Sequence, residues 1–285
     1  MPLAALLLVL GAAFCHSTWN LIVKSDRRPI LVQSGALAIG VVIASPALFI
    51  YSLRDLSSTA WLLVFLSALF ETGYVFGLST AYEISDLSLV YPIARGTAPL
   101  VVTPVAMALF GESLSASGLV GIALVVAGIY GSHAGFVHRR SAPSASREAL
   151  TLAVLTGVMT AGYSLVNRVG VRVMPIPLYA FLVFALNVAM IQVVFALRGT
   201  WHRPFRRDTP WARTLVVAIL MMATYLAVLS AMSMAPVSYV VAAREVSIVV
   251  AALLGALVLN ERHSPARIAG AVVIFAGLVT IALSR

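Results

Sequence analysis

The sequence predicts an all-α polytopic membrane protein with ten transmembrane helices, arranged as two inverted five-helix repeats. Three observations predict it: a strong excess of hydrophobic residues, ten apolar segments of membrane-spanning length, and an internal repeat. Of the 285 residues, 61% are hydrophobic and 10% are charged, whereas a typical soluble chain has about 25% charged residues. The mean hydropathy is +1.02. So little polar surface cannot cover a water-facing globule, and lipid must surround most of the chain.

A helix that crosses a bilayer needs about 20 mostly apolar residues. Segments that meet this need follow one another along the whole chain. They are residues 2–23, 30–53, 60–82, 87–110, 116–132, 149–167, 177–197, 211–234, 237–259 and 265–283. The two longest links, residues 133–148 and 198–210, contain no apolar run that could form a soluble core. We therefore expect no separate soluble domain.

The fifth span and the residues before it are repeated near the C-terminus. Residues 111–131, GESLSASGLVGIALVVAGIYG, align with residues 260–280, NERHSPARIAGAVVIFAGLVT, at an offset of 149 positions. The same offset places Arg95 on Arg244. A repeat at this distance predicts a duplicated unit of five spans.

The two predicted repeats are residues 1–140 and residues 147–285. Because each has an odd number of spans, the second must enter the membrane from the opposite side. Secondary transporters use this inverted-repeat design and bind substrate near the membrane midplane between the halves. We therefore expect a substrate site between the two repeats.

The ten-span layout and the sequences FGE and LNE at the ends of the fourth and ninth spans, each followed by a small-residue helix, resemble one known family. It is the EamA-type branch of the drug/metabolite transporter superfamily, and the resemblance covers nearly the whole chain. It implies a permease or exporter for a small organic compound, with a path lined by spans one, three, four, six, eight and nine. We expect an integral protein of a bacterial cytoplasmic (inner) membrane.

Charged side chains inside the spans are the first candidates for the substrate site, because each costs at least about 2.5 kcal/mol to insert at the bilayer centre. Arg95 and Arg244 lie at matching positions of the fourth and ninth spans, Glu71 lies midway along the third, and Glu245 follows Arg244. Two guanidinium groups near the midplane are suited to bind a carboxylate or phosphate. The alternative is that these arginines form structural ion pairs with Glu71 and Glu245.

Polar and aromatic residues on the other path-lining spans complete the predicted site. They are His16, Trp19, Asn20, Tyr74, Tyr91, Tyr163, Asn167 and Tyr225. For His16 the alternative is a buried, hydrogen-bonded structural role, and for Trp19 it is membership of an interfacial aromatic belt. We expect Lys24 to extend to the interface, and Glu112 and Glu261 to have turn or capping roles at helix ends.

Three prolines, Pro92, Pro99 and Pro104, interrupt the backbone hydrogen bonding of the fourth span. The ninth span has no proline between residues 237 and 259. We therefore expect hinging to be asymmetric between the halves, with the kinks in the fourth span.

The distribution of Lys and Arg between the links predicts orientation. The links after odd-numbered spans hold thirteen, namely Lys24, Arg27, Arg28, Arg139, Arg140, Arg147, Arg198, Arg203, Arg206, Arg207, Arg213, Arg262 and Arg267. The other side holds Arg54, Arg168, Arg172 and Arg285. This count places both termini outside the cytoplasm, whereas the resemblance implies that both lie inside, and the orientation stays open.

The predicted function is secondary transport of a small polar organic metabolite that bears a carboxylate, phosphate or phosphonate group, by alternating access between the two repeats. The chain contains no GxxxxGK[ST] phosphate loop, so a gradient or exchange must drive transport. We expect no cofactor, metal site, catalytic residue or nucleic-acid partner. The expected partners are the substrate, membrane lipid and, as coupling ion, protons carried by Glu71 or Glu245. Homodimer formation stays open.

Two other functions stay open. A broad-specificity drug exporter would use the tyrosines of the predicted site as an aromatic surface. An integral-membrane lipid-modifying enzyme would need clustered acidic or histidine groups near one interface. The acidic residues in the links are scattered without such spacing, which disfavours the enzyme.

Overall fold

The computed structural model of the chain describes residues 1–24, 26, 29–84, 87–132, 147–197, 199, 210–259 and 265–284, and none of these residues forms a β-strand. The helices are α1 (Leu3–Lys24), α2 (Pro29–Ala44), α3 (Ala47–Ile50), α4 (Ser58–Ile84), α5 (Leu87–Phe110), α6 (Ala116–Gly131), α8 (Arg147–Val173), α9 (Ile176–Leu197), α10 (Trp211–Met234), α11 (Val237–Arg244), α12 (Ser247–Leu259) and α13 (Pro265–Leu283). The predicted all-α membrane fold is confirmed.

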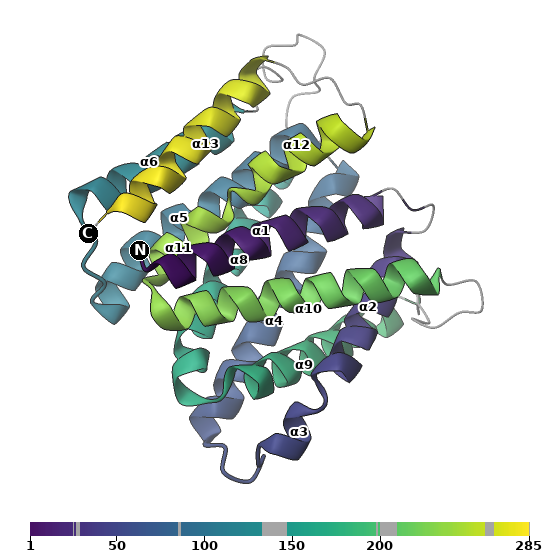
Figure 1. Ribbon diagram of the computed structural model, residues 1–285. Coiled ribbons are helices and arrows are strands. Elements are labelled where there is room, and N and C mark those ends of the chain that lie inside the picture. The colour runs from purple at the N-terminus through teal and green to yellow at the C-terminus, as the bar shows by residue number, and fades with distance from the viewer. Residues whose placement is uncertain are drawn as a thin grey trace.

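Within this described part, nine candidate spans are long and apolar enough to cross a membrane, and α6, with 16 residues, is shorter. At 1.5 Å per residue, α6 is about 24 Å long. The two chain ends lie together at one end of the bundle (Figure 1), and the amino group of Met1 donates a hydrogen bond to the carbonyl of Ser284 at 3.2 Å. Termini on the same side require an even number of crossings, so α6 counts as the tenth.

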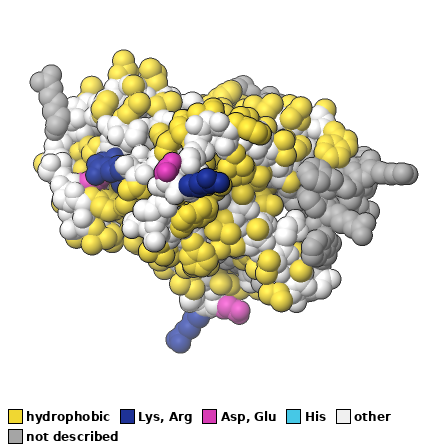
Figure 2. Space-filling view, turned by 90° about the horizontal axis from the view of Figure 1, so that it is seen from below, with side chains coloured by type: hydrophobic (Ala, Val, Ile, Leu, Met, Phe, Trp, Pro, Cys, Tyr) yellow, Lys and Arg dark blue, Asp and Glu magenta, His cyan; other side chains and the backbone are white. Residues whose placement is uncertain are grey.

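Hydrophobic side chains cover the outside of the bundle. Phe49 is 91% exposed, Leu197 82% and Leu109 71%. Figure 2 shows one face of the molecule, on which hydrophobic side chains predominate and charged ones are few. Such a surface is stable in lipid and would aggregate in water.

The second predicted span, residues 30–53, is not one continuous helix. It is divided into α2 and α3 at Ser45 and Pro46, and α3 ends at Ile50. The break has a local cause, because Pro46 has no backbone N–H to donate to the preceding turn. Ser45 instead closes a tighter turn, with its N–H donating to the Val42 carbonyl at 3.2 Å.

The prolines of the fourth span do not end its helix, and the kinks expected there stay a prediction. The fourth span runs unbroken as α5, with Pro92, Pro99 and Pro104 inside it. The ninth span is divided into α11 and α12 at Glu245 and Val246, although no proline lies there. Around this break the backbone makes short-range bonds, from the Glu245 N–H to the Ala242 carbonyl and from the Val246 N–H to the Ala243 carbonyl, each at 3.1 Å.

The helices pack in a pattern that a two-fold axis between the halves explains. Helix α1 packs against α10 and α12, and its counterpart α8 packs against α4 and α5. Helix α2 packs against α10, as α9 packs against α4. The two repeats are therefore interleaved, and most helices have their main partners in the other repeat. Figure 1 shows α6 and α13 side by side at one end of this arrangement.

Glycines allow α6 and α13 to approach each other at backbone distance. A Cβ atom on Gly128 would lie 2.7 Å from the backbone N of Ile274 and 2.8 Å from the Gly270 carbonyl oxygen. A Cβ on Gly277 would lie 2.7 Å from the Gly121 carbonyl oxygen. Small residues permit this close packing in lipid, where apolar burial alone gives helices little reason to associate. Close backbone contact therefore joins α6 and α13 at one end of the bundle.

Candidate functional site

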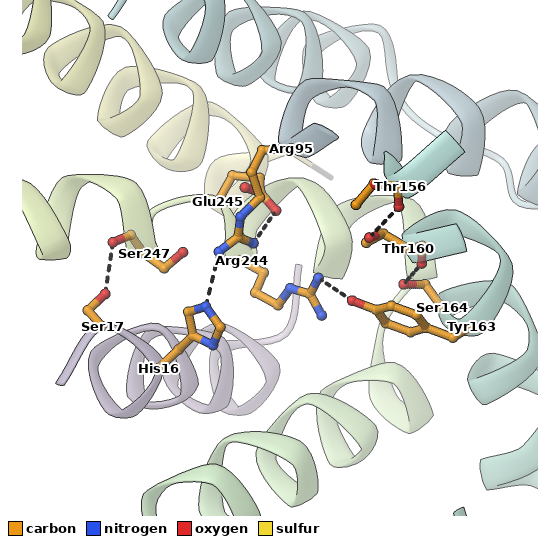
Figure 3. A network of polar contacts seen from close by, with 10 residues as sticks. All are labelled: His16, Ser17, Arg95, Thr156, Thr160, Tyr163, Ser164, Arg244, Glu245 and Ser247. Atoms are coloured by element: carbon orange, nitrogen blue, oxygen red, sulfur yellow. Dashed lines mark hydrogen bonds and ion pairs between the residues drawn. The ribbon is translucent and has the colours of Figure 1, made fainter. Parts of the chain in front are cut away.

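The charged residues of the fourth and ninth spans meet inside the bundle, at the break between α11 and α12 (Figure 3). Arg95 of α5 is 8% exposed, and its Nη1 lies 3.2 Å from Oε1 of Glu245. Its Nη2 lies 3.0 Å from Nε2 of His16 on α1. Glu245 is fully buried, and its other oxygen, Oε2, has no hydrogen-bond partner among the described residues. Arg95 therefore neutralises a buried carboxylate.

Arg244 has different surroundings. Its side chain is half-buried and extends toward α8 (Figure 3), where Nη2 donates a hydrogen bond to the hydroxyl of Tyr163 at 3.1 Å. The guanidinium carbon lies 5.9 Å from the centre of the Tyr163 ring, a cation–π distance. In the part of the chain that the structure describes, no carboxylate forms an ion pair with Arg244.

The sequence explains this difference between the two arginines. Glu245 follows Arg244, and the position related to Glu245 by the offset of 149 is residue 96, which is glycine. A Cβ at Gly96 would lie 2.8 Å from the Tyr130 ring. The first repeat therefore supplies no second carboxylate at the matching position, so the two-fold symmetry of the arginines does not extend to their charge partners.

Helix α1 bonds to the start of α12, just after the break beside Glu245. The hydroxyl of Ser17 donates to the Ser247 carbonyl at 2.8 Å (Figure 3). The Ser247 hydroxyl oxygen is buried without a hydrogen-bond partner among the described residues. Broken helices with free polar groups at membrane depth are typical of transporter substrate sites.

A second polar cluster lies where α4, α8, α9 and α10 meet. The Asn167 side-chain oxygen accepts hydrogen bonds from the hydroxyls of Ser67 at 2.6 Å and Tyr179 at 2.7 Å, and its amide lies 3.5 Å from the Tyr225 hydroxyl. Glu71 lies beside Tyr225 and Asn167 and interacts electrostatically with Arg244. One of its carboxylate oxygens, Oε1, is buried without a hydrogen-bond partner among the described residues.

The structure brings most predicted site residues to these two clusters. Trp19 contacts the His16 ring edge-on at 5.0 Å between centroids, and Tyr74 contacts Tyr163 in the same way at 6.2 Å. Asn20 does not join them, because it is exposed and its amide donates to the His16 carbonyl of its own helix at 2.9 Å. The side chain of Tyr91 lies outside the described residues.

The sequence analysis missed several buried polar residues. The sixth span was expected to end at residue 167, but α8 continues to Val173 and includes Arg168, which is 9% exposed. Its Nη1 donates to the carbonyl of Met232. Asn187, in the middle of the seventh span, donates to the Thr72 hydroxyl at 3.0 Å. A mid-span asparagine could have been found by the reasoning that found Glu71, whereas Arg168 required knowing where the helix ends.

The expected capping role of Glu112 is confirmed. Its carboxylate accepts bonds from the backbone N–H groups of Val237 and Ser238, at 2.6 and 3.3 Å, at the start of α11. The repeat-related Glu261 and the side chain of Lys24 lie outside the described residues. No group of three or more His, Cys, Asp or Glu residues that could hold a metal occurs in the described part of the chain.

Comparison with known proteins gives three findings. A solved structure described as the crystal structure of a protein superposes with a TM-score of 0.76 and 19% sequence identity, covering 99% of this chain and 98% of that chain, which shows a shared fold. None of the curated proteins compared with the chain matches it. The model of the EamA-like transporter family matches twice, at residues 3–133 and 147–283. These two matches cover nearly all of the sequence, and the chain belongs to the EamA-like transporter family.

Proposed function

We propose that this member of a transporter family is a secondary transporter for a small polar organic metabolite with an anionic group, a carboxylate, phosphate or phosphonate, in a bacterial cytoplasmic membrane. The observation that carries the proposal is the unequal pairing of the two arginines inside the bundle. Arg95 lies against Glu245, whereas Arg244 reaches Tyr163 and forms no ion pair with the described residues.

The charge balance favours an anionic solute. A cation inside the membrane is costly unless a counter-charge accompanies it. The ion pair of Arg95 with Glu245 is internally neutral, and no carboxylate of the described residues forms an ion pair with Arg244. A carboxylate or phosphate could accept two parallel hydrogen bonds from its guanidinium group. The two arginines then have different roles, Arg244 binding the anion and Arg95 holding the broken helix.

The packing suggests which parts of the protein move during alternating access. Because the repeats are interleaved, one repeat cannot rock against the other as a rigid body. We propose instead that α1, α2, α10, α11 and α12 form one moving group, and that α4, α5, α8 and α9 form the other. Each group takes helices from both repeats, and most of the strong contacts fall within the groups. Arg244 and Tyr163 then lie on opposite sides of the boundary between them.

Replacing Arg244 with alanine is expected to lower substrate transport, as kcat/KM, by about 10- to 100-fold, because a hydrogen-bonded charge contributes roughly 1.5–3 kcal/mol to binding. Arg244→Lys should recover little of it, since an ammonium group cannot make the bidentate contact. The measurement is uptake of candidate organic anions by vesicles containing the purified protein. Arg54→Ala, which removes an exposed arginine, serves as the control. Full activity of Arg244→Ala with every transported anion would refute this anion site.

We also propose that protons drive the transport and that Glu71 carries them. The proposal rests on its buried Oε1, which has no hydrogen-bond partner among the described residues, and on its electrostatic interaction with Arg244, through which protonation of the carboxylate could alter anion binding. Glu71→Gln is expected to abolish accumulation driven by an imposed pH gradient and to preserve exchange of substrate for substrate. Wild-type vesicles whose transport rate ignores the gradient would contradict this proposal.

A broad-specificity drug exporter is the second candidate. The edge-on contact of Tyr74 with Tyr163 favours it, because it adds aromatic surface beside the arginines. Competition experiments separate the two candidates. Organic anions should inhibit transport if the first proposal is right, and lipophilic cations should inhibit it if the second is right.

A further inference from the structure

The connection between α10 and α11 has no side chain that caps the helix ends it joins. Helix α10 ends at Met234, Ala235 is extended, and Pro236 precedes α11 without a side-chain capping bond. The first N–H groups of α11 and the last carbonyls of α10 therefore need partners from elsewhere. This corner lies at the same end of the bundle as both chain termini (Figure 1).

Two charged residues supply those partners. Glu112, in the link between α5 and α6, accepts bonds from the N–H groups of Val237 and Ser238 and from the Ser238 hydroxyl, the last at 2.7 Å. Arg168, near the end of α8, donates to the Met232 carbonyl in the last turn of α10. We name Glu112 and Arg168 the corner clamp. The anion lies at a helix N-terminus and the cation at a helix C-terminus, so both complement the helix dipoles.

The local backbone directs Glu112 to this position. The preceding residue, Gly111, has a φ of 63°, a left-handed conformation that glycine adopts without strain and other residues adopt at a cost. The turn ends α5 and brings the Glu112 N–H back to the Ala106 carbonyl at 3.4 Å. The FGE sequence of the fourth span thus has a structural meaning, since the glycine makes the turn and the glutamate reaches α11.

The corner clamp connects the two proposed moving groups at one face of the bundle. Glu112 follows α5, and Arg168 belongs to α8, whereas both bonded helix ends belong to the group that contains α10 and α11. Arg168 and Glu112 also interact electrostatically with each other. Separation of the groups at this face must break all of these bonds together.

Helix α11 links the corner clamp to the substrate site. It has eight residues and is about 12 Å long at 1.5 Å per residue. Its first two N–H groups are held by Glu112, and its last residue is Arg244. The break at Glu245 and Val246 separates it from α12.

We infer that Glu112 and Arg168 are positioning residues for transport. Together they hold closed the terminal face, which is the end of the bundle where both chain termini lie, and they set the position of Arg244 through α11. The inference rests on the proposed transport function. In the alternating cycle the clamp forms in the state closed at the terminal face and breaks in the state open there.

Cysteine labelling tests the inference without any substrate. In a Cys15→Ala background, which removes the single native cysteine, Ala235→Cys places a thiol at the corner, where Ala235 is 2% exposed. Thr214→Cys places a second thiol at the opposite end of α10, at a fully buried position. The rate of reaction with a water-soluble maleimide then reports opening at each end separately.

Glu112→Ala and Arg168→Gln are each expected to raise the labelling rate at position 235 by at least about tenfold, since each removes a charge-assisted hydrogen bond that closes this face. Labelling at position 214 should not rise, because in alternating access a state open at the terminal face is closed at the opposite end. Glu112→Asp, which keeps the carboxylate, should be labelled at position 235 more slowly than Glu112→Ala. Glu148→Gln, at an exposed glutamate in the first turn of α8, is the matched control.

Two results would overturn the inference. An equal rise at positions 235 and 214 would show that the variants loosen the whole fold, which would leave the clamp with a stabilising role alone. A labelling rate at 235 no higher than that of the Glu148→Gln control would show that these bonds do not keep the face closed. Because labelling needs no solute, failure of the anion-transport proposal would appear in the uptake assay and not here.

Discussion

Replacing Arg95 with alanine is expected to reduce the free energy of unfolding by about 3–5 kcal/mol, the usual cost of removing one partner of a buried ion pair. The cost arises because Glu245 is fully buried and its Oε2 already has no hydrogen-bond partner among the described residues. Without Arg95 the carboxylate would be buried without its counter-ion at the break in the ninth span. Denaturant or thermal unfolding of the purified protein measures the loss.

A double variant separates this structural role from a direct role in substrate binding. Arg95→Met with Glu245→Gln removes both charges, and it should recover most of the stability, since neutral residues can replace a buried pair at little cost. Arg54→Ala, at an exposed site, should leave the unfolding free energy within about 0.5 kcal/mol of wild type. If Arg95→Ala were as stable as the Arg54 variant, the ion pair with Glu245 would not stabilise the fold. The prediction that Arg95 and Arg244 together bind the substrate anion would then regain support.

Enlarging Gly128 to leucine is expected to cost about 3 kcal/mol or more, or to prevent folding. Overpacking a well-packed core typically costs about 1–3 kcal/mol when side chains can adjust. Here the obstructing atoms are backbone, the N of Ile274 and the carbonyl oxygen of Gly270, at 2.7 and 2.8 Å from the new Cβ. Backbone atoms can yield only if α6 and α13 separate. The yield of inserted protein and its unfolding midpoint measure the effect.

Gly11→Leu is the matched control for this prediction. Gly11 lies inside α1, and a Cβ placed there has no atom within 4 Å. Leucine is a better helix former than glycine, so the control should be neutral or slightly stabilising. Equal stability of the Gly128 and Gly11 variants would mean that α6 and α13 do not rely on close backbone contact.

The sequence alone predicted the broad architecture for clear physical reasons. The number of spans follows from the bilayer thickness, and the internal repeat follows from a fixed offset that is visible in the residues themselves. Charged residues inside apolar spans were found because lipid makes them costly, and Arg95, Arg244, Glu245 and Glu71 all lie in the two interior polar clusters. The place of Glu112 at a helix end predicted a turn or capping role, although the helix that it caps, α11, is distant in the sequence.

Only the tertiary structure decided how those residues are paired and which helices pack together. The repeat makes Arg95 and Arg244 equivalent in sequence, yet one faces Glu245 and the other faces Tyr163. The buried Arg168 likewise has its partner, the Met232 carbonyl, on a helix distant in the sequence. The reason is physical: hydropathy is a sum over neighbours along the chain, whereas the charge balance of a buried group depends on which side chains reach it across the bundle.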